Sequence, residues 1–312
     1  MTVTQHTYAR RGVLRLGTRR SLMATTQSQM VADRLTTLTG ATVELVGITT
    51  FGDVTKAQLS QIGGTGVFVS ALRDKLIDGE IDFAVHSLKD LPTTPDPRVL
   101  VAAIPPRDDP RDALVGPAKL ADLPPGARVG TGSPRRIAQL RALRPDLEYV
   151  PIRGNADTRI GKVASGELQA VVLAAAGLGR LGRDGEISEV FEPGDMLPAP
   201  GQGALAVECR AGDDDLIGLL AALDDPRTRA AVTAERTVLA ALEAGCSAPV
   251  GAFAADAGHI LNLTAAVVAL DGTRSVRKST AGDLSAAMDL GRDLAAAMIA
   301  EGAGTLMEER TH

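Results

Sequence analysis

The hydrophobic positions in the first two-thirds of the chain alternate between two periods. Short β-branched or apolar runs at Val13–Gly17, Thr42–Thr50 and Ile81–His86 are typical of strands. Between them, Ser21–Leu38 and Val67–Ile77 place apolar residues at helical spacing. Strands that alternate with helices predict βαβ units and a mostly parallel sheet.

Two stretches rich in proline interrupt this alternation. Ile104–Arg111 (IPPRDDPR) comes first, and the strand and helix patterns resume after it. Leu197–Gly203 (LPAPGQG) comes second and leads into a strand pattern, Ala204–Cys209. Such stretches mark crossings between domains. We therefore predict an α/β chain that leaves domain 1 (13–105 and 204–222), builds domain 2 (106–203) and returns, with a cleft between the two.

The remainder of the chain has a different pattern. Thr228–Ala244 is an amphipathic helix, and His259–Leu270 is a strand followed by an Asp271-Gly272 hairpin turn. A final helix follows, capped by Asp283. We predict a smaller C-terminal α+β domain over 223–312.

Composition narrows the classes of function. The 312 residues carry a net charge of −5 and only 2% aromatic residues, which argues against nucleic-acid binding. The two cysteines form no CxxC pair, so we predict no metal site and a reducing, cytoplasmic location. Residues 1–12 lack the apolar core of a signal peptide and are predicted to be a flexible tail. No apolar run is long enough for a membrane span.

Arginine is concentrated in one part of this acidic chain. Residues 128–159 hold seven arginines and three acidic residues, a local net charge of +4. Three strand-to-helix junctions, LRLGTRRS, VGTGSPRR and IRGNADTR, each combine a glycine, a capping residue and arginine. In the second, Ser133 and Pro134 begin a helix whose first turn holds Arg135 and Arg136.

Two cations at the positive end of a helix are unfavourable unless an anion lies there. At a single junction, arginines that merely extend into water are the simpler explanation. Three junctions together favour a ligand with several carboxylates or phosphates. Arginine rather than lysine suits planar carboxylates.

An acidic residue follows the strand Ile81–His86 in the sequence HSLKDLPT. Asp90 lies at the end of the sheet where the arginine-bearing junctions are expected to converge. It can lock an arginine in a salt bridge, which is the commoner role, or stabilise a cation that forms during a reaction. His86 can be a base, but a single histidine at a strand end is more often structural.

Cys246 follows the end of a helix, where the helix dipole disfavours a thiolate. A recycled nucleophile is therefore disfavoured. A buried structural cysteine is the better interpretation, and a permanent attachment point for an electrophilic ligand is the alternative. Cys209, inside a strand, is interpreted as a core residue.

Seven motifs in order resemble the porphobilinogen deaminase (hydroxymethylbilane synthase) family, from about Val13 to Val250. The resemblance implies two periplasmic-binding-protein-like α/β domains with a central cleft, a C-terminal domain, and a dipyrromethane cofactor joined to Cys246 by a thioether. It implies the condensation of four porphobilinogen molecules with loss of ammonia, then hydrolytic release of hydroxymethylbilane. The motifs are LRLGTRRS, AVHSLKDLPT, GTGSPRR, LRPDLEYVPIRGNADTR, AGLGRLG, PAPGQGALAVECR and LEAGCSAPVG.

The same resemblance assigns roles to individual residues. Asp90 stabilises the azafulvenium cation, and either Asp90 or Arg19 protonates the leaving amine. It also implies a monomer that binds the growing oligopyrrole, with a transient hand-off to uroporphyrinogen-III synthase left open. Cofactor contacts are Asp53, Ser87, Lys89, Thr131, Ser133, Arg135, Arg136 and Arg159; substrate contacts are Arg19, Ser21, Phe68, Arg153, Arg159 and Arg180.

The chain departs from the family pattern near the expected site. An arginine and a lysine frequent in the family are missing from the stretch Thr50–Phe68, and Gly132 replaces a usual serine. A two-lobed solute-binding or ligand-sensing protein is the alternative function. The missing signal peptide and helix-turn-helix weaken it, and Asp90 and Cys246 within their motifs favour the enzyme.

Overall fold

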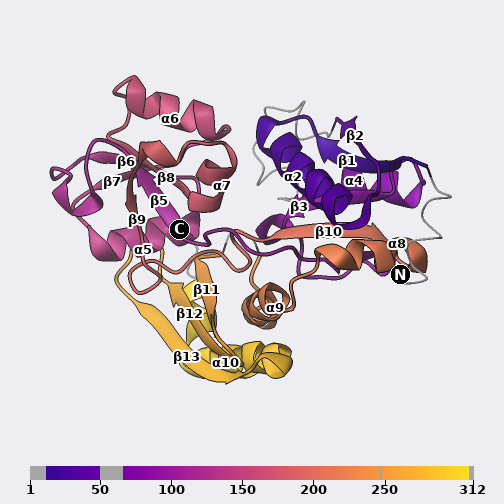
Figure 1. Cartoon of the computed structure of the whole chain (residues 1–312). Helices are drawn as coiled ribbons and strands as arrows, with labels where there is room; N and C mark the ends of the chain where they lie inside the picture. The colour runs from indigo at the N-terminus through magenta and orange to yellow at the C-terminus, as the bar shows by residue number, and fades with distance from the viewer. Residues whose placement is uncertain (1–11, 50–65, 246–247, 309–312) are drawn as a thin grey trace. The chain divides into compact units, whose positions relative to one another are not determined.

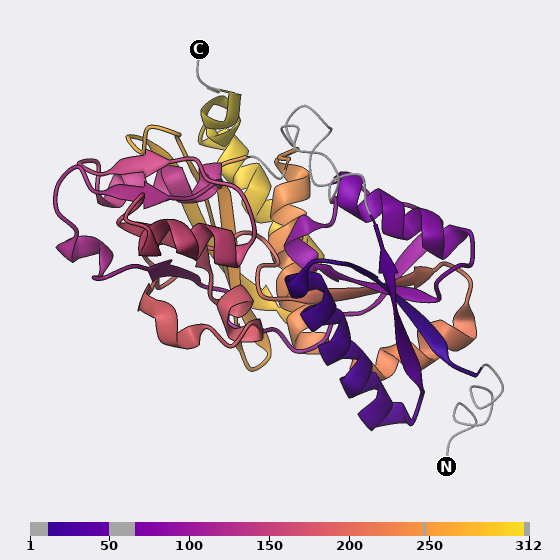
Figure 2. The same ribbon diagram turned by 90° about the horizontal axis from the view of Figure 1, so that it is seen from above.

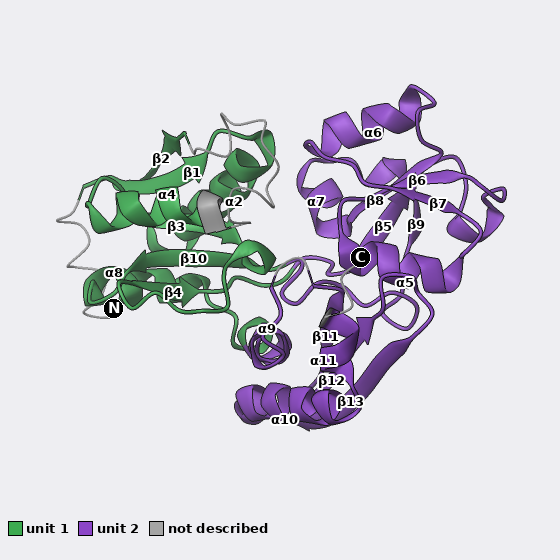
Figure 3. Cartoon of the chain, turned by 180° about the vertical axis from the view of Figure 1, so that it is seen from behind, with its two compact units in different colours: residues 1–107, 204–229 green, residues 108–203, 230–312 purple. Residues whose placement is uncertain are grey.

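The computed structural model of the 312-residue chain describes residues 12–49, 66–245 and 248–308. Two compact units are distinguished (Figure 3). Unit 1 takes in residues 1–107 and 204–229, and unit 2 takes in 108–203 and 230–312. The chain leaves unit 1 within the first proline-rich stretch and returns directly after the second. The finer division into three domains stays a prediction.

Unit 1 contains a five-stranded sheet in the order β2-β1-β3-β10-β4 (Figure 1). β10 is antiparallel to both of its neighbours, and the other four strands share one direction. The reversed strand is the one that re-enters unit 1 from unit 2. Its strands are β1 (Leu14–Arg19), β2 (Val43–Ile48), β3 (Phe83–Ser87), β4 (Val99–Ala103) and β10 (Leu205–Arg210).

Helices cover both faces of this sheet (Figure 2). α2 (Leu22–Thr39) and α8 (Asp214–Leu220) pack on one face, where Leu35 and Leu216 are fully buried. α4 (Gly66–Ile77) packs on the other, around Leu72 and Leu76. The predicted bounds of α2 are confirmed, because Ser21 caps its first turn and Gly40 ends it at a φ of 75° that suits glycine.

Unit 2 contains a second sheet with the same arrangement, in the order β7-β6-β8-β5-β9. Here β5, the strand that enters from unit 1, is antiparallel to both neighbours. α5 (Pro134–Leu143) covers one face, and α6 (Ala156–Ala164) and α7 (Ala175–Arg180) cover the other. Its strands are β5 (Asp112–Val115), β6 (Arg128–Gly130), β7 (Glu148–Val150), β8 (Ala170–Ala174) and β9 (Ile187–Val190).

The C-terminal part of unit 2 is a three-stranded antiparallel sheet, β11-β12-β13. Its helices bury one face in a separate hydrophobic core. The other face meets α5, where Ala266 and Val268 of β12 pack with Ala138 and Leu197. The elements are α9 (Pro226–Ala241, whose first turn belongs to unit 1), β11 (Val250–Ala257), β12 (Ile260–Val268), β13 (Ser275–Asp283), α10 (Ala287–Ala300) and α11 (Ala303–Glu308).

The predicted fold class is confirmed: the chain has two α/β sheets covered by helices and a smaller α+β part. Each α/β sheet is mostly parallel, with one reversed strand. Within the described residues, no helix has the length and apolar character needed to cross a membrane. Of the predicted tail 1–12, only Gly12 lies within the described residues.

Candidate active site

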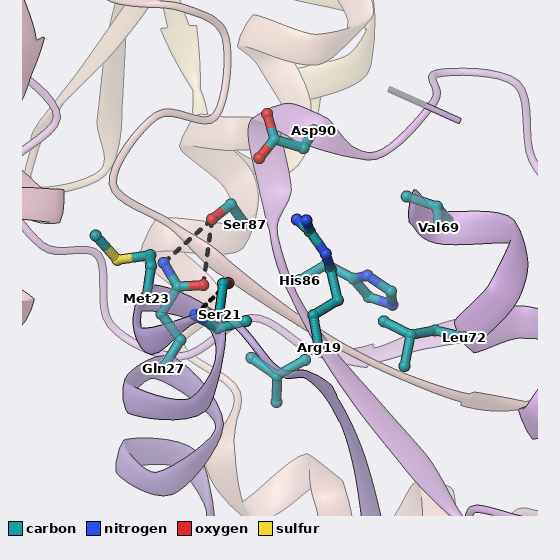
Figure 4. A pocket seen from close by; sticks show the side chains of 11 residues that line it. Arg19, Ser21, Met23, Gln27, Val69, Leu72, His86, Ser87 and Asp90 are labelled. Atoms are coloured by element: carbon teal, nitrogen blue, oxygen red, sulfur yellow. Dashed lines mark hydrogen bonds between the residues drawn. The ribbon is translucent and has the colours of Figure 1, made fainter. Parts of the chain in front are cut away.

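Unit 1 has a pocket where β1 and β3 end, with a volume of about 290 Å³ (Figure 4). This size lies at the small end of the range for small-molecule sites. The carboxyl ends of parallel strands are the expected position for a ligand in an α/β sheet. The lining combines charged, polar and apolar side chains: Arg19, Ser21, Met23, Ala24, Gln27, Val69, Leu72, Val85, His86, Ser87 and Asp90.

The structure brings four of the predicted residues together in this pocket: Arg19, Ser21, Ser87 and Asp90. Arg19 is the last residue of β1 and is half-buried, whereas Asp90 is exposed at the end of a short 3₁₀ turn after β3. A cation and an anion thus share one small cavity. Among the described residues, no side chain is hydrogen-bonded to the Asp90 carboxylate.

Gln27 is a pocket residue that sequence reasoning missed. It is buried on α2, and its Nε2 and Oε1 lie 3.2 Å and 3.3 Å from Ser87 Oγ. Ser21 Oγ accepts a hydrogen bond from the backbone N–H of Ala24 at 3.4 Å. Both hydroxyls are therefore oriented by α2 before any ligand binds. A polar residue on the side of α2 that also carries Val31, Ala32 and Leu35 is the signal that could have identified Gln27.

His86 also lines the pocket and contacts a buried ion pair. Its Nε2 lies 3.3 Å from Oε2 of Glu208 on β10. Arg73 of α4 donates to both oxygens of Glu208, at 2.8–3.2 Å. Burial raises the pKa of Glu208, but its interactions with nearby His86 and with Arg73 outweigh this and leave the pKa below its ordinary value. Sequence reasoning missed Glu208, although a charged residue in the apolar run ALAVEC was a signal.

In unit 2, the paired arginines of the second junction meet a carboxylate of the protein itself. Arg135 Nη1 and Arg136 Nη2 each lie 2.7 Å from Asp112, the first residue of β5. Asp112 is fully buried and also accepts from Gln202 at 2.8 Å. Burial raises the pKa of Asp112, but the two arginine charges outweigh it and hold the pKa far below its usual range. The anion expected at this helix start is therefore supplied, at least in part, from within the fold.

The capping expected at this junction is confirmed. Ser133 Oγ accepts from the backbone N–H of Arg136 at 3.4 Å, and Pro134 is the first helical residue. Thr131 is fully buried, and its Oγ1 accepts from the Ser133 N–H at 3.3 Å. A Cβ at Gly132 would lie 2.6 Å from the backbone oxygen of Ile152, so a serine there needs a backbone shift.

The other predicted arginines of unit 2 differ in their surroundings. Arg180 is bound to Asp108 at 2.8 Å and to the Gly203 oxygen at 2.6 Å. Arg153 is exposed. Arg159 is half-buried, and both burial and the positive charge of Arg136 lower its pKa. A carboxylate at Arg159 would relieve this electrostatic penalty.

Comparison with known proteins identifies the family to which the chain belongs. Two family models match it: "Porphobilinogen deaminase, dipyromethane cofactor binding domain" over residues 14–218, and "Porphobilinogen deaminase, C-terminal domain" over residues 229–300. The chain belongs to the porphobilinogen deaminase family. The predicted family is thereby confirmed.

Relatives resemble the chain over nearly its whole length. The porphobilinogen deaminase of Thermobifida fusca is 61% identical over 306 residues, covering 95% of this chain and 96% of the relative. Porphobilinogen deaminase 1 of Streptomyces coelicolor is 59% identical, covering 95% and 98%. A periplasmic substrate-binding protein of an ABC transporter from Coxiella burnetii, a solved structure, is 13% identical with a TM-score of 0.44, covering 72% of this chain and 96% of that one. At that TM-score the likeness adds nothing to the fold described above.

The first family model describes a domain that binds a dipyrromethane cofactor, and the chemistry of the residues present suits this group. A dipyrromethane offers pyrrole N–H donors and several carboxylates. Within unit 1, Asp90 is an acceptor at the pocket. Within unit 2, Arg153 and Arg159 are cations of the kind that suits carboxylates. Lys89 is half-buried in the same 3₁₀ turn as Asp90. Asp53, Cys246 and the side chain of Phe68 lie outside the described residues.

Proposed function

We propose that this protein is a hydroxymethylbilane synthase of tetrapyrrole biosynthesis. It condenses four porphobilinogen molecules head to tail, with loss of one ammonia at each step, and then releases the linear tetrapyrrole by hydrolysis. The observation that carries the proposal is the pocket of unit 1, where Asp90 and Arg19 line one cavity in a chain of the porphobilinogen deaminase family.

Asp90 is proposed to stabilise positive charge on the substrate. When ammonia leaves the aminomethyl group, the remaining azafulvenium is a cation whose pyrrole N–H can donate to a carboxylate. An ionised carboxylate positioned before the reaction lowers the energy of that cation without reorganisation. Arg19 carries the opposite charge in the same pocket and suits an acetate or propionate of the substrate. Ser21 and Ser87, both held by α2, offer hydroxyls beside it.

The arginines of unit 2 are proposed to bind carboxylates of the cofactor and the growing chain, since each pyrrole carries an acetate and a propionate. Arg153 is exposed, and Arg159 has a lowered pKa beside another cation, so both gain from an added anion. Arg135, Arg136 and Arg180 each hold a carboxylate of the protein already. Their proposed ligand contacts, like those of Thr131 and Ser133, must use the donors that remain.

The dipyrromethane is proposed to be joined through a thioether to Cys246, and when bound it supplies the primer on which the tetrapyrrole is built. The chain has two cysteines, and Cys209 is a poor candidate. It is fully buried in β10, and burial raises the pKa of its thiol to about 11. Asp53 and Lys89 are proposed as further contacts to the cofactor. A monomer in the cytoplasm that hands its product to a cyclising synthase remains part of this proposal.

Product stoichiometry tests the proposed function. Purified protein given porphobilinogen should release one ammonia for each porphobilinogen consumed and one tetrapyrrole for each four. The product, left without a cyclising enzyme, should close spontaneously to a uroporphyrinogen that oxidation converts to a coloured porphyrin. Ammonia, substrate and porphyrin are measured in the same reaction. Binding of porphobilinogen without release of ammonia would refute the enzyme and favour a ligand-binding protein.

A further inference from the structure

Three ionisable side chains, those of Arg73, His86 and Glu208, meet between α4 and the sheet, next to apolar residues. Around them, Leu72 and Leu76 of α4 pack with Ile81 and Ala84. His86 is 7% exposed and Glu208 is 1% exposed, and Arg73 reaches Glu208 from the helix. A buried ion pair is weak in net stabilisation, because desolvation offsets most of the attraction. Stability alone therefore gives little reason for this cluster, and its position against the pocket suggests a role there.

The geometry resembles a carboxylate–histidine pair in which an arginine fixes the carboxylate. Arg73 donates to both oxygens of Glu208, and Glu208 Oε2 lies 3.3 Å from Nε2 of His86, although the two are not aligned as a hydrogen bond. A carboxylate beside one ring nitrogen favours a proton on that nitrogen and leaves the other nitrogen as an acceptor. Figure 4 shows the imidazole of His86 in the pocket wall, near Arg19 and Leu72.

The proposed reaction requires a proton acceptor as well as a stabilised cation. When the free α-carbon of a terminal pyrrole bonds to the azafulvenium, that carbon becomes tetrahedral and must lose its proton. The protonated guanidinium of Arg19 has no basic lone pair to accept a proton. Asp90 is already assigned to the pyrrole N–H groups. His86 is the remaining group of the pocket lining with a basic nitrogen.

We propose that His86 accepts this proton at Nδ1 and that Glu208 acts through it as a positioning residue; the inference rests on the proposed function. The α-carbon–hydrogen bond breaks, and its electron pair restores the aromatic ring. The proton forms an N–H bond on Nδ1, and the imidazolium is stabilised by the Glu208 carboxylate. The proton then passes to water before the next cycle. This proton and the ammonia released in the same step together give one ammonium ion for each porphobilinogen added.

The test uses porphobilinogen that carries deuterium at its free α-carbon. His86→Gln should lower kcat about 10²- to 10⁴-fold, the usual contribution of a general base. Because proton removal then limits the rate, the deuterated substrate should react more slowly than the normal one, and this ratio should exceed that of the unaltered protein. A merely structural histidine would reduce the melting temperature or the cofactor content without changing the isotope ratio.

Glu208→Gln tests the positioning role and also serves if His86→Gln fails to fold. It should lower kcat by less than His86→Gln and also raise the isotope ratio. In the variant that carries both substitutions, Glu208→Gln should lower kcat little beyond the effect of His86→Gln, because both substitutions impair the same proton transfer. Lys75→Gln is the control: Lys75 lies on α4 like Arg73, but it pairs with exposed Glu80.

The outcomes separate the two proposals. If the unaltered protein releases no ammonia from porphobilinogen, the proposed function fails. If it does release ammonia, and folded His86→Gln keeps its rate or slows with an unchanged isotope ratio, only the assignment of His86 is overturned. An unchanged isotope ratio in Glu208→Gln, with His86→Gln behaving as expected, removes the positioning role of Glu208.

Discussion

Asp90→Asn is expected to lower the rate of porphobilinogen consumption about 10²- to 10³-fold, the typical cost of removing one preorganised electrostatic contact to a transition state. Asparagine keeps the size of the side chain but removes the negative charge that is proposed to stabilise the azafulvenium. The melting temperature should stay close to that of the unaltered protein, since Asp90 is exposed at the end of its 3₁₀ turn. Initial rates of ammonia release and thermal unfolding measure the two effects.

The chain offers a closely matched control for this variant. Asp122 is also the exposed last residue of a three-residue 3₁₀ turn, Leu120–Asp122, but it belongs to unit 2 and does not line the pocket. Asp122→Asn makes the same chemical change and should leave the rate unaltered. Equal rates for both variants and the unaltered protein would remove Asp90 from the reaction.

Of the substitutions proposed for this protein, Asp112→Asn should cause the largest decrease in the free energy of unfolding. The variant leaves Arg135 and Arg136 buried without their shared counter-charge, which typically costs about 3–5 kcal/mol. Asp289→Asn, in an exposed pair with Arg292 of the same unit, is the control and should change stability little. Urea unfolding at pH 7 compares the two. If Asp112→Asn unfolds at the same urea concentration as the control, the ion cluster is not holding unit 2 together.

Acid should reduce the difference between Asp112→Asn and the unaltered protein. The arginine charges keep the pKa of Asp112 below its unfolded value of about 3.9. A group with a depressed pKa contributes its full stability above the unfolded pKa and loses it as the pH falls toward the folded pKa. The stability difference should therefore be constant between pH 7 and pH 5 and become smaller by pH 3. A difference that grows in acid would contradict this assignment.

Local signals in the sequence predicted local structure well. Ser21 and Ser133 cap the helices expected of them, and Gly40 ends α2. These features depend on residues within one turn of each other. Motifs placed Arg19, Ser21, Ser87 and Asp90 near one another, and the pocket contains all four.

Contacts between segments that are far apart in the sequence could not be predicted from such local signals. Glu208 meets His86 because β10 returns from unit 2 and pairs with β3, at a register that the sequence does not specify. The partner of Arg135 and Arg136 was missed for a related reason. Asp112 directly follows a proline-rich crossing, and only the pairing of β5 between β8 and β9 brings it beneath α5.

The intact mass of the freshly purified chain tests the central claim most directly. The account predicts an added mass equal to two linked pyrroles, retained after denaturation because the thioether is covalent. Cys246→Ser should lose both this mass and turnover, while Cys209→Ser should retain the mass, since Cys209 is buried in β10. An active, unmodified chain, or an added mass that persists in Cys246→Ser, would contradict the account.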